Sequence, residues 1–199
     1  MQSAEIELKF PVASISHLEV QLGELGFRLD TPRTFEQNTL YDTPERTLRA
    51  KGELLRLRRY GKRSVVTHKR HPDNEELASL YKVRIETETE FDDESAMVEI
   101  LARLGFAPSF RYEKFRSEYS HPAEQGAHLV LDETPIGVYA ELEGPPAWID
   151  RTLGKLRIDP ATCLTESYGK LFMAWRERTG STAQNLTFDE IAESTMVAR

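Results

Sequence analysis

Cysteine is almost missing from this chain of 199 residues, which contains Cys163 alone. A single cysteine excludes an intramolecular disulfide and a zinc cluster built on several thiolates. No apolar run is long enough to span a membrane, and the N-terminus lacks the basic segment and apolar run of a secretory signal. We therefore expect a protein of the reducing cytoplasm with no membrane partner.

A basic excess is also missing. Asp and Glu number 33 against 26 Lys and Arg, which gives a formal net charge of −7. Domains that bind nucleic acid usually carry a basic excess, so we expect no nucleic-acid partner. The length fits one domain with a short appendage. We place the domain at residues 1–178 and a C-terminal tail, either helical or disordered, at 179–199.

Hydrophobic periodicity predicts strands and helices in mixed order. Alternating side chains predict strands at residues 4–10, 33–42, 53–60, 63–70, 81–91, 109–120, 127–133 and 137–143. Apolar residues at helical spacing predict helices at 15–25, around 97–104, at 147–156 and at 165–177, with weaker helical character at 188–196. The polar segment 71–79 is predicted to be a loop.

A repeat with an offset of 79 residues runs through these elements. Glu5, Glu7 and Lys9 align with Arg84, Glu86 and Glu88. Leu25-Gly26-Phe27 aligns with Leu104-Gly105-Phe106, where glycine is expected to end a helix in each copy. Two halves of the type strand, helix, strand could close on each other and form one barrel.

The charged residues of the strands recur at every second position, so they share one face of each strand. They are Glu5, Glu7 and Lys9; Arg56 and Arg58; Lys69 beside Thr67; Arg84, Glu86 and Glu88; Lys114 and Arg116; Asp132; and Glu141 and Glu143. The ordinary interpretation is an antiparallel sheet with one solvated face. However, six or more strands repeat the pattern, and several amphipathic helices need an apolar surface to cover. We therefore favour a barrel whose apolar face is outside, under the helices, and whose charged face lines a wet tunnel.

A tunnel lined by both signs of charge suits a polyanion accompanied by hard divalent cations. Mg²⁺ and Mn²⁺ take oxygen ligands, and arginine forks bind phosphate oxygens in pairs. Phosphoryl transfer relies on such positioning, metal charge and basic groups. The alternative for each basic residue is an ordinary internal ion pair, but an inward set this large favours a ligand or much water.

These motifs follow one another in a recognisable order. They are Glu5-Ile6-Glu7-Leu8-Lys9, Asn38 to Thr43, Leu55 to Arg58, Thr67 to Lys69, Arg84 to Glu88, Lys114 to Arg116, Leu131-Asp132, Glu141 to Glu143 and Ser167-Tyr168. The set resembles CYTH-domain proteins, the triphosphate tunnel metalloenzymes, over about residues 4–175. The resemblance implies an α+β fold: a closed eight-stranded antiparallel β-barrel with helices packed on the outside. It also implies Mg²⁺ or Mn²⁺ as cofactor and allows a homodimer.

The resemblance also assigns roles to individual residues. Lys69 and Glu7 would be catalytic, Lys69 by assisting activation of the attacking water. The triphosphate would be bound by Lys9, Arg56, Arg58, Lys69, Arg84, Lys114 and Arg116. The metal would be held by Glu5, Glu7, Asp132, Glu141 and Glu143, with contributions from Glu86 and Glu88.

Family members cleave inorganic triphosphate, nucleoside triphosphates or thiamine triphosphate. Thiamine triphosphatases carry a Tyr and a Trp where this chain has Leu40 and Val66, so thiamine triphosphate is the least favoured substrate. We expect hydrolysis of inorganic triphosphate or a nucleoside triphosphate first. The second hypothesis is a class IV adenylate cyclase, which makes cyclic AMP and pyrophosphate from ATP. The third is a non-catalytic module that binds polyphosphate or nucleotides.

Other polar residues are expected to be structural. The five histidines show no i, i+4 pair, so surface or structural roles are expected for them rather than metal binding: His17, His68, His71, His121 and His128. Cys163 lies just before the last predicted helix of the domain and is expected to be a packing residue rather than a nucleophile. Thr187 and Glu190 form a capping-box pattern in the tail, which would let residues 180–199 plug one end of the tunnel.

Overall fold

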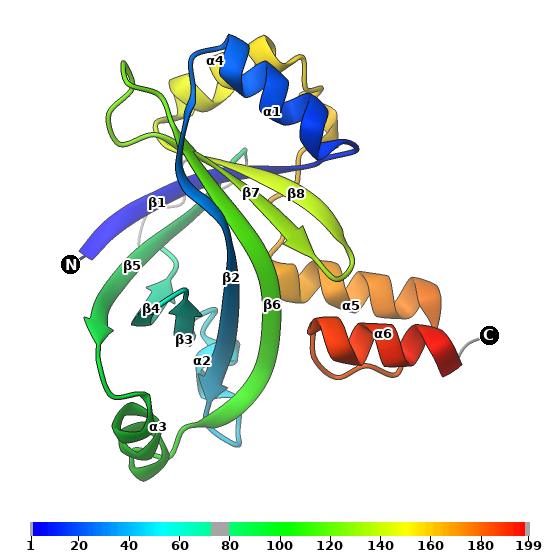
Figure 1. Ribbon diagram of the computed structural model, residues 1–199. Coiled ribbons are helices and arrows are strands. Elements are labelled where there is room, and N and C mark those ends of the chain that lie inside the picture. Colours follow the sequence, from blue (N-terminus) through cyan, green and yellow to red (C-terminus); the bar gives the residue numbers. More distant parts are fainter. Residues whose placement is uncertain (1, 73–79, 198–199) are drawn as a thin grey trace.

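This computed structural model describes residues 2–72 and 80–197. Eight antiparallel strands of these residues close into a barrel in the order β1-β5-β4-β3-β2-β6-β7-β8, and β8 pairs back to β1 (Figure 1). The strands are β1 (Gln2–Pro11), β2 (Arg28–Asp42), β3 (Leu54–Tyr60), β4 (Arg63–Arg70), β5 (Lys82–Phe91), β6 (Ala107–Ser120), β7 (His128–Thr134) and β8 (Gly137–Glu143). The predicted α+β barrel is therefore confirmed. Most of the loop predicted at 71–79 lies outside the described residues.

Helices lie on the outside of this barrel. They are α1 (Ile15–Glu24), the short α2 (Thr47–Ala50), α3 (Glu94–Arg103), α4 (Pro146–Leu156), the 3₁₀ turn η1 (Pro160–Thr162), α5 (Tyr168–Thr179) and α6 (Phe188–Val197). Among the described residues, none of these helices has the length and apolar character that crossing a membrane requires.

The largest apolar core lies between α1, α4 and the outer face of β1, β7 and β8. Leu8 and Phe10 of β1 are 7% and 1% exposed, and they alternate with Glu7 and Lys9 on the inner face. Leu22 of α1 and Ile149 of α4 pack on this surface. Figure 1 shows the two helices side by side over this part of the barrel. Burial of the outer face thus decides which face of β1 points inward.

The sequence repeat appears as two units of the same type, β1-α1-β2 and β5-α3-β6. Both helices end in the same way, at Gly26 and Gly105, whose φ angles are +84° and +87°. The amides of Phe27 and Phe106 then bond the carbonyls five residues earlier, each at 2.9 Å. This Schellman geometry favours glycine because an L side chain is strained at positive φ. The repeated units pair with each other, β1 with β5 and β2 with β6.

Helix α5 covers one end of the barrel interior. Phe172 of α5 is 1% exposed and packs with Phe110 and Tyr112 of β6, and Tyr139 of β8 joins the same cluster. Tyr112 and Tyr139 lie two residues from Lys114 and Glu141, on the same inward faces. The end of the tunnel is therefore filled by aromatic side chains.

The C-terminal tail lies alongside α5, with α6 drawn below it in Figure 1. Leu186 is fully buried and pairs with β6 through two backbone hydrogen bonds, to Arg111 and Glu113. Thr187 caps α6, and the Glu190 side chain bonds the Asn185 and Gln184 amides instead of closing a capping box. The side chain that reaches the charged tunnel at this end is Tyr168 of α5.

Strand β2 and helix α2 differ most from the sequence prediction. Strand β2 begins at Arg28 rather than at 33, because bulges around Pro32 let the strand continue through a residue that has no backbone donor. Helix α2 was not predicted. It exists because Asp42 accepts three backbone hydrogen bonds, from Thr43, Leu48 and Arg49.

Replacement of Phe172 tests the closure of the barrel by α5. We expect Phe172→Ala to lower the free energy of unfolding by about 3–5 kcal/mol, the usual loss for a buried phenylalanine. Met173, the next residue, is 54% exposed, so Met173→Ala should change the free energy of unfolding by no more than about 0.5 kcal/mol. Urea denaturation of the two variants would measure the difference, and equal values would mean that α5 is not packed as described.

Candidate functional site

The barrel interior holds charged side chains out of contact with bulk water. Lys9 is 1% exposed, and Glu36 and Asp132 are fully buried. Burial of a charge is strongly unfavourable unless partners compensate it. The arrangement of these partners therefore shows what the interior is built to hold.

Three carboxylates converge on one side of the tunnel. Glu5 and Glu7 of β1 and Glu143 of β8 each place one oxygen within 4.8 Å of the others. Burial, together with the charges of Glu5 and Glu7, raises the pKa of Glu143 to about 7. Burial also raises the pKa of Glu5, but the ammonium groups of Lys69 and Lys82 outweigh it and lower that pKa. The cluster thus carries a repulsion that a cation would relieve.

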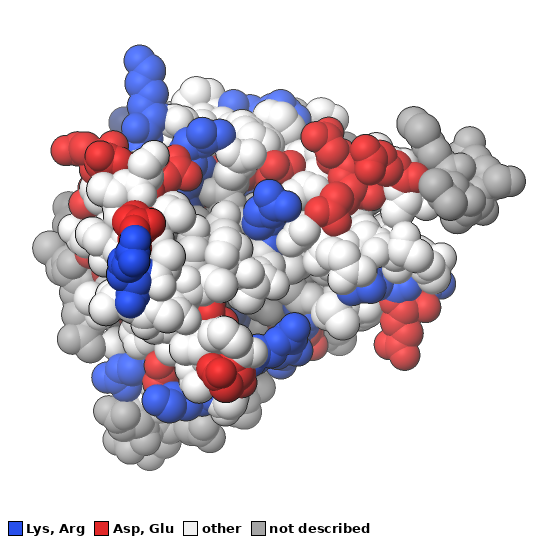
Figure 2. All heavy atoms as spheres, turned by 90° about the horizontal axis from the view of Figure 1, so that it is seen from below, with Lys and Arg blue, Asp and Glu red and all other residues white. Residues whose placement is uncertain are grey.

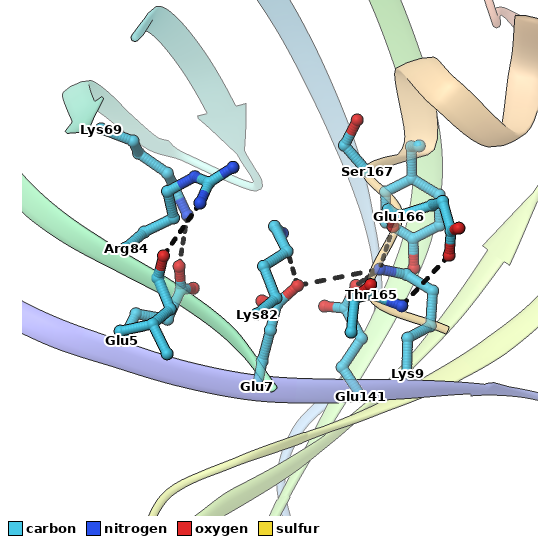
Figure 3. Close-up of polar contacts among 12 residues, drawn as sticks. Glu5, Glu7, Lys9, Lys69, Lys82, Arg84, Glu141, Thr165, Glu166 and Ser167 are labelled. Atoms are coloured by element: carbon cyan, nitrogen blue, oxygen red, sulfur yellow. Dashed lines mark hydrogen bonds and ion pairs between the residues drawn. The ribbon is translucent and has the colours of Figure 1, made fainter. Parts of the chain in front are cut away.

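This cluster fits a hard divalent cation. It offers carboxylate oxygens from two adjacent strands, which are the donors that Mg²⁺ and Mn²⁺ prefer. Figure 3 shows Glu5 and Glu7 projecting from β1 toward Lys69, Arg84 and Lys82. Lys82 Nζ lies 2.5 Å from Glu7 Oε1. Cation ligands and basic groups therefore lie next to each other.

Asp132 and Glu141 lie among basic groups. Arg116 is paired with both, with Nη2 2.7 Å from Asp132 Oδ2 and 2.8 Å from Glu141 Oε2. Lys114 contacts Asp132 at 2.8 Å, and Lys9 contacts Glu141 at 2.7 Å. In this arrangement the two carboxylates fix the positions of basic side chains. Their predicted role as metal ligands stays a prediction.

Lys69 lies between two carboxylates at the opposite wall. Its Nζ is 2.9 Å from Glu5 Oε2 and also contacts Glu86. Burial lowers the pKa of Lys69 to about 8; Glu5 opposes this shift, and Arg56 adds to it. Glu88, two residues beyond Glu86, lies further out, where it is exposed and accepts a hydrogen bond from Thr67.

Arg56 is buried without a carboxylate partner among the described residues. It is 5% exposed, and its guanidinium donates to the Tyr112 hydroxyl at 3.2 Å and to Thr67 Oγ1 at 3.3 Å. Its Nε has no hydrogen-bond partner among the described residues. Arg58, on the same inward face, has its Nε 3.7 Å from Oε1 of Glu36. A buried cation in this state favours the binding of an anion.

Four side chains complete the site beyond those predicted from the sequence. Glu36 of β2 contacts Lys114 and Arg58, and although burial raises its pKa, these two residues hold it well below the ordinary value. Lys82 contacts Glu7, Tyr112 accepts from Arg56, and Tyr168 donates to Asp132 at 2.7 Å. Lys82 could have been predicted from the sequence, because it lies two residues before Arg84 and therefore on the same face of β5. The alternation of β2 likewise brings Glu36 and Asn38 to one face.

The structure places the predicted site residues on inward faces of one barrel. Those that lie in its interior are Glu5, Glu7, Lys9, Arg56, Arg58, Lys69, Arg84, Glu86, Lys114, Arg116, Asp132, Glu141 and Glu143, and Glu88 stands at the rim. On the face that Figure 2 shows, basic and acidic side chains are scattered among uncharged ones, with one group of acidic side chains near the grey atoms at the upper right.

Comparisons with known proteins agree with this geometry. The model of the CYTH domain matches residues 3–144. A curated protein of Methanocaldococcus jannaschii, "Putative adenylate cyclase", is 26% identical over 139 residues, which are 70% of this chain and 75% of that protein.

Two solved structures show the shared fold. A "putative adenylate cyclase" from Vibrio parahaemolyticus superposes with a TM-score of 0.70 at 19% identity, over 85% of this chain and 97% of the other. A "Putative adenylyl cyclase" from Hippeastrum, described as having a dominant triphosphatase activity, gives a TM-score of 0.60 at 22% identity, over 88% and 96%.

Thermal unfolding tests the carboxylate cluster. Because the pKa of Glu143 is raised in the folded protein, its contribution to stability is complete below its ordinary value of 4.5 and is lost as the pH rises through about 7. At pH 8, Glu143→Gln should therefore raise the Tm of the metal-free protein by roughly 2–4 °C, the shift that about 1 kcal/mol produces in a chain of this length.

Addition of Mn²⁺ should raise the Tm of the wild-type protein and have much less effect on the Gln variant. Glu99→Gln is the matched control, because Glu99 is exposed on α3 and pairs with Arg103. If Mn²⁺ stabilised the Glu143→Gln variant as much as the wild type, Glu143 would not be a ligand.

Proposed function

The chain belongs to the CYTH domain family, and we propose that it hydrolyses a triphosphate that it holds with a divalent cation inside the barrel. Inorganic triphosphate and nucleoside triphosphates are the proposed substrates. Mg²⁺ or Mn²⁺ is the proposed cofactor.

One observation supports this proposal most. The interior presents a cluster of carboxylates and, across the tunnel, an arginine that no carboxylate neutralises among the described residues. The cluster of Glu5, Glu7 and Glu143 needs a cation, and Arg56 needs an anion. A triphosphate with its escorting cation satisfies both needs at once.

The residues of this chain divide into three roles. Glu5, Glu7 and Glu143 hold the cation, which when bound offsets negative charge on the phosphoryl group. Arg56 and Arg58, both on β3, bind phosphate oxygens. The remaining phosphate ligands are Lys9, Arg84, Lys114 and Arg116, of which Lys9, Lys114 and Arg116 are held in place by Glu36, Asp132 and Glu141.

Lys69 is the proposed general base. Since its pKa is about 8, about a tenth of the Lys69 side chains are neutral amines at pH 7 and about half at pH 8. The neutral amine accepts a proton from the water that attacks the terminal phosphorus. Hydrogen bonding to Glu5 holds Nζ beside the carboxylate cluster, where the phosphates would be bound.

Inorganic triphosphate and nucleoside triphosphates are favoured over thiamine triphosphate, because Leu40 and Val66 provide no aromatic ring where thiamine triphosphatases carry a Tyr and a Trp. Leu40 packs in the aromatic cluster under α5, and Val66 packs with the residues under α3. The Hippeastrum protein with the same fold, which is described as having a dominant triphosphatase activity, supports hydrolysis as the first candidate.

Cyclisation of ATP is the second candidate. The name of the Methanocaldococcus jannaschii relative supports it. Both reactions use the same triphosphate site and differ in the nucleophile, which is water in one case and the ribose 3′-hydroxyl in the other.

A product assay tests the function. The protein would be incubated with inorganic triphosphate or ATP and with Mg²⁺ or Mn²⁺, and phosphate, pyrophosphate and cyclic AMP would be measured together. We expect phosphate release as the main reaction. Glu7→Gln and Arg58→Ala should abolish it in folded protein, whereas Arg59→Ala should not, because exposed Arg59 pairs with Gln37.

Cyclic AMP with an equal amount of pyrophosphate would establish the cyclase instead. Tight binding of triphosphate without any product would leave a binding module. Full activity in Glu7→Gln or Arg58→Ala would contradict the proposed site at that residue.

The pH dependence of kcat/KM tests Lys69. This ratio reports the free enzyme, so it should rise about tenfold per pH unit below 8 and level off above, as Lys69 loses its proton. Lys69→Arg keeps the charge but no longer titrates, so it should lower kcat by about 10²- to 10⁴-fold. Retention of activity and of the rising limb by the Arg variant would assign the proton transfer to another group.

A further inference from the structure

His71 lies two residues beyond Lys69, just after the end of β4. Its ring nitrogen Nδ1 is 3.0 Å from Nη1 of Arg84, which projects from the neighbouring strand β5. A guanidinium has donors only, so Nδ1 must be the acceptor of this bond. His71 is therefore hydrogen-bonded to Arg84, a residue of the proposed phosphate site.

This contact decides which edge of the Arg84 guanidinium stays free for a ligand. Nη1 also donates to the backbone carbonyl of Val83 at 2.9 Å, so both of its N–H groups are used. The three remaining N–H groups of the guanidinium are on Nε and Nη2. That edge is one of the two that bind a phosphate through a pair of parallel hydrogen bonds. Figure 3 shows Arg84 beside Lys69 and above Glu5.

The ring of His71 is itself held by its surroundings. Its edge lies against Gly52, where a Cβ atom would come within 2.7 Å of Cδ2. Gly52 has a φ of +70° and donates to the Arg49 carbonyl at 3.1 Å, and Asp42 fixes the same turn through its bond to the Arg49 amide. Glycine at position 52, in the turn after α2, therefore leaves space for the His71 ring that any residue with a Cβ atom would fill.

We propose that His71 is a positioning residue, seated on Gly52, that orients Arg84 so that its Nε–Nη2 edge binds a substrate phosphate. This inference rests on the proposed function and explains how Arg84, one of the proposed phosphate ligands, is oriented. His71 does not touch the reacting atoms. It accepts a hydrogen bond that fixes the guanidinium before the substrate arrives, which reduces the ordering required on binding.

Substitutions at position 71 separate the hydrogen bond from the ring packing. His71→Phe keeps a ring against Gly52 and removes the acceptor, whereas His71→Asn keeps an acceptor near the Nδ1 position and removes the ring. With inorganic tripolyphosphate as substrate, the Phe variant should raise KM by about 3- to 10-fold with little change in kcat, the range expected for one hydrogen bond. The Asn variant should stay within about twofold of the wild type.

His68→Ala is the matched control, because His68 of β4 contacts Glu53 instead of a tunnel residue. Its KM should equal that of the wild type. Gly52→Ala should raise KM as His71→Phe does, because the added methyl group displaces the ring. Gly180 has the same φ of +70°, and a Cβ added there would meet no atom of the described residues within 4 Å, so Gly180→Ala imposes the same backbone strain and should leave KM unchanged.

A double-mutant cycle with Arg84→Ala decides the mechanism. In that background His71→Phe should have no further effect on KM, since the residue through which it acts is gone. The inference is overturned if the Phe variant has the wild-type KM, or if it raises KM equally with and without Arg84. If the wild type binds tripolyphosphate without cleaving it, the calorimetric Kd replaces KM with the same expectations. A wild type that neither binds nor cleaves would overturn the proposed function along with this inference.

Discussion

The closure of the sheet into a barrel is the constraint on which the rest of the molecule depends. In an open sheet the charged faces of these strands would lie in water. Closure places them opposite one another instead, because α1 and α4 bury the apolar outer face that carries Leu8 and Phe10. A charged side chain on an inward face can then be compensated only by other groups in the interior or by a bound ligand. Glu36 and Asp132, which have no contact with solvent, are compensated by Lys114 and by arginines of neighbouring strands.

The pairing inside the barrel is not uniform, and this gives the interior its chemical character. Lys114 and Arg116 are matched by Asp132, so that side of the tunnel is preorganised. Glu143 lies beside the like charges of Glu5 and Glu7, and among the described residues Arg56 is hydrogen-bonded to hydroxyl groups and to no carboxylate. The two kinds of unmatched group lie on different strands and face one space. A cation and a polyanion bound together are the ligands that complete both.

Much of the fold and of the site follows from alternation along the chain. Glu5 and Glu7 alternate with Ile6 and Leu8, and this pattern predicts both the inward face of β1 and the carboxylates that meet there. Contacts that depend on the register between paired strands could not be predicted from the sequence. Glu36 is the clearest example, because its partners come from β3 and β6. Helix α2 likewise depends on three backbone hydrogen bonds to one aspartate rather than on any periodicity.

The central claim is that the interior binds a triphosphate together with a divalent cation. Crystals soaked with Mn²⁺ and inorganic tripolyphosphate would test it most directly, since Mn²⁺ is located by its anomalous scattering. The account predicts a Mn²⁺ peak among Glu5, Glu7 and Glu143, with phosphate density between that peak and Arg56. A peak elsewhere, or phosphate bound only to the exterior of the barrel, would contradict it.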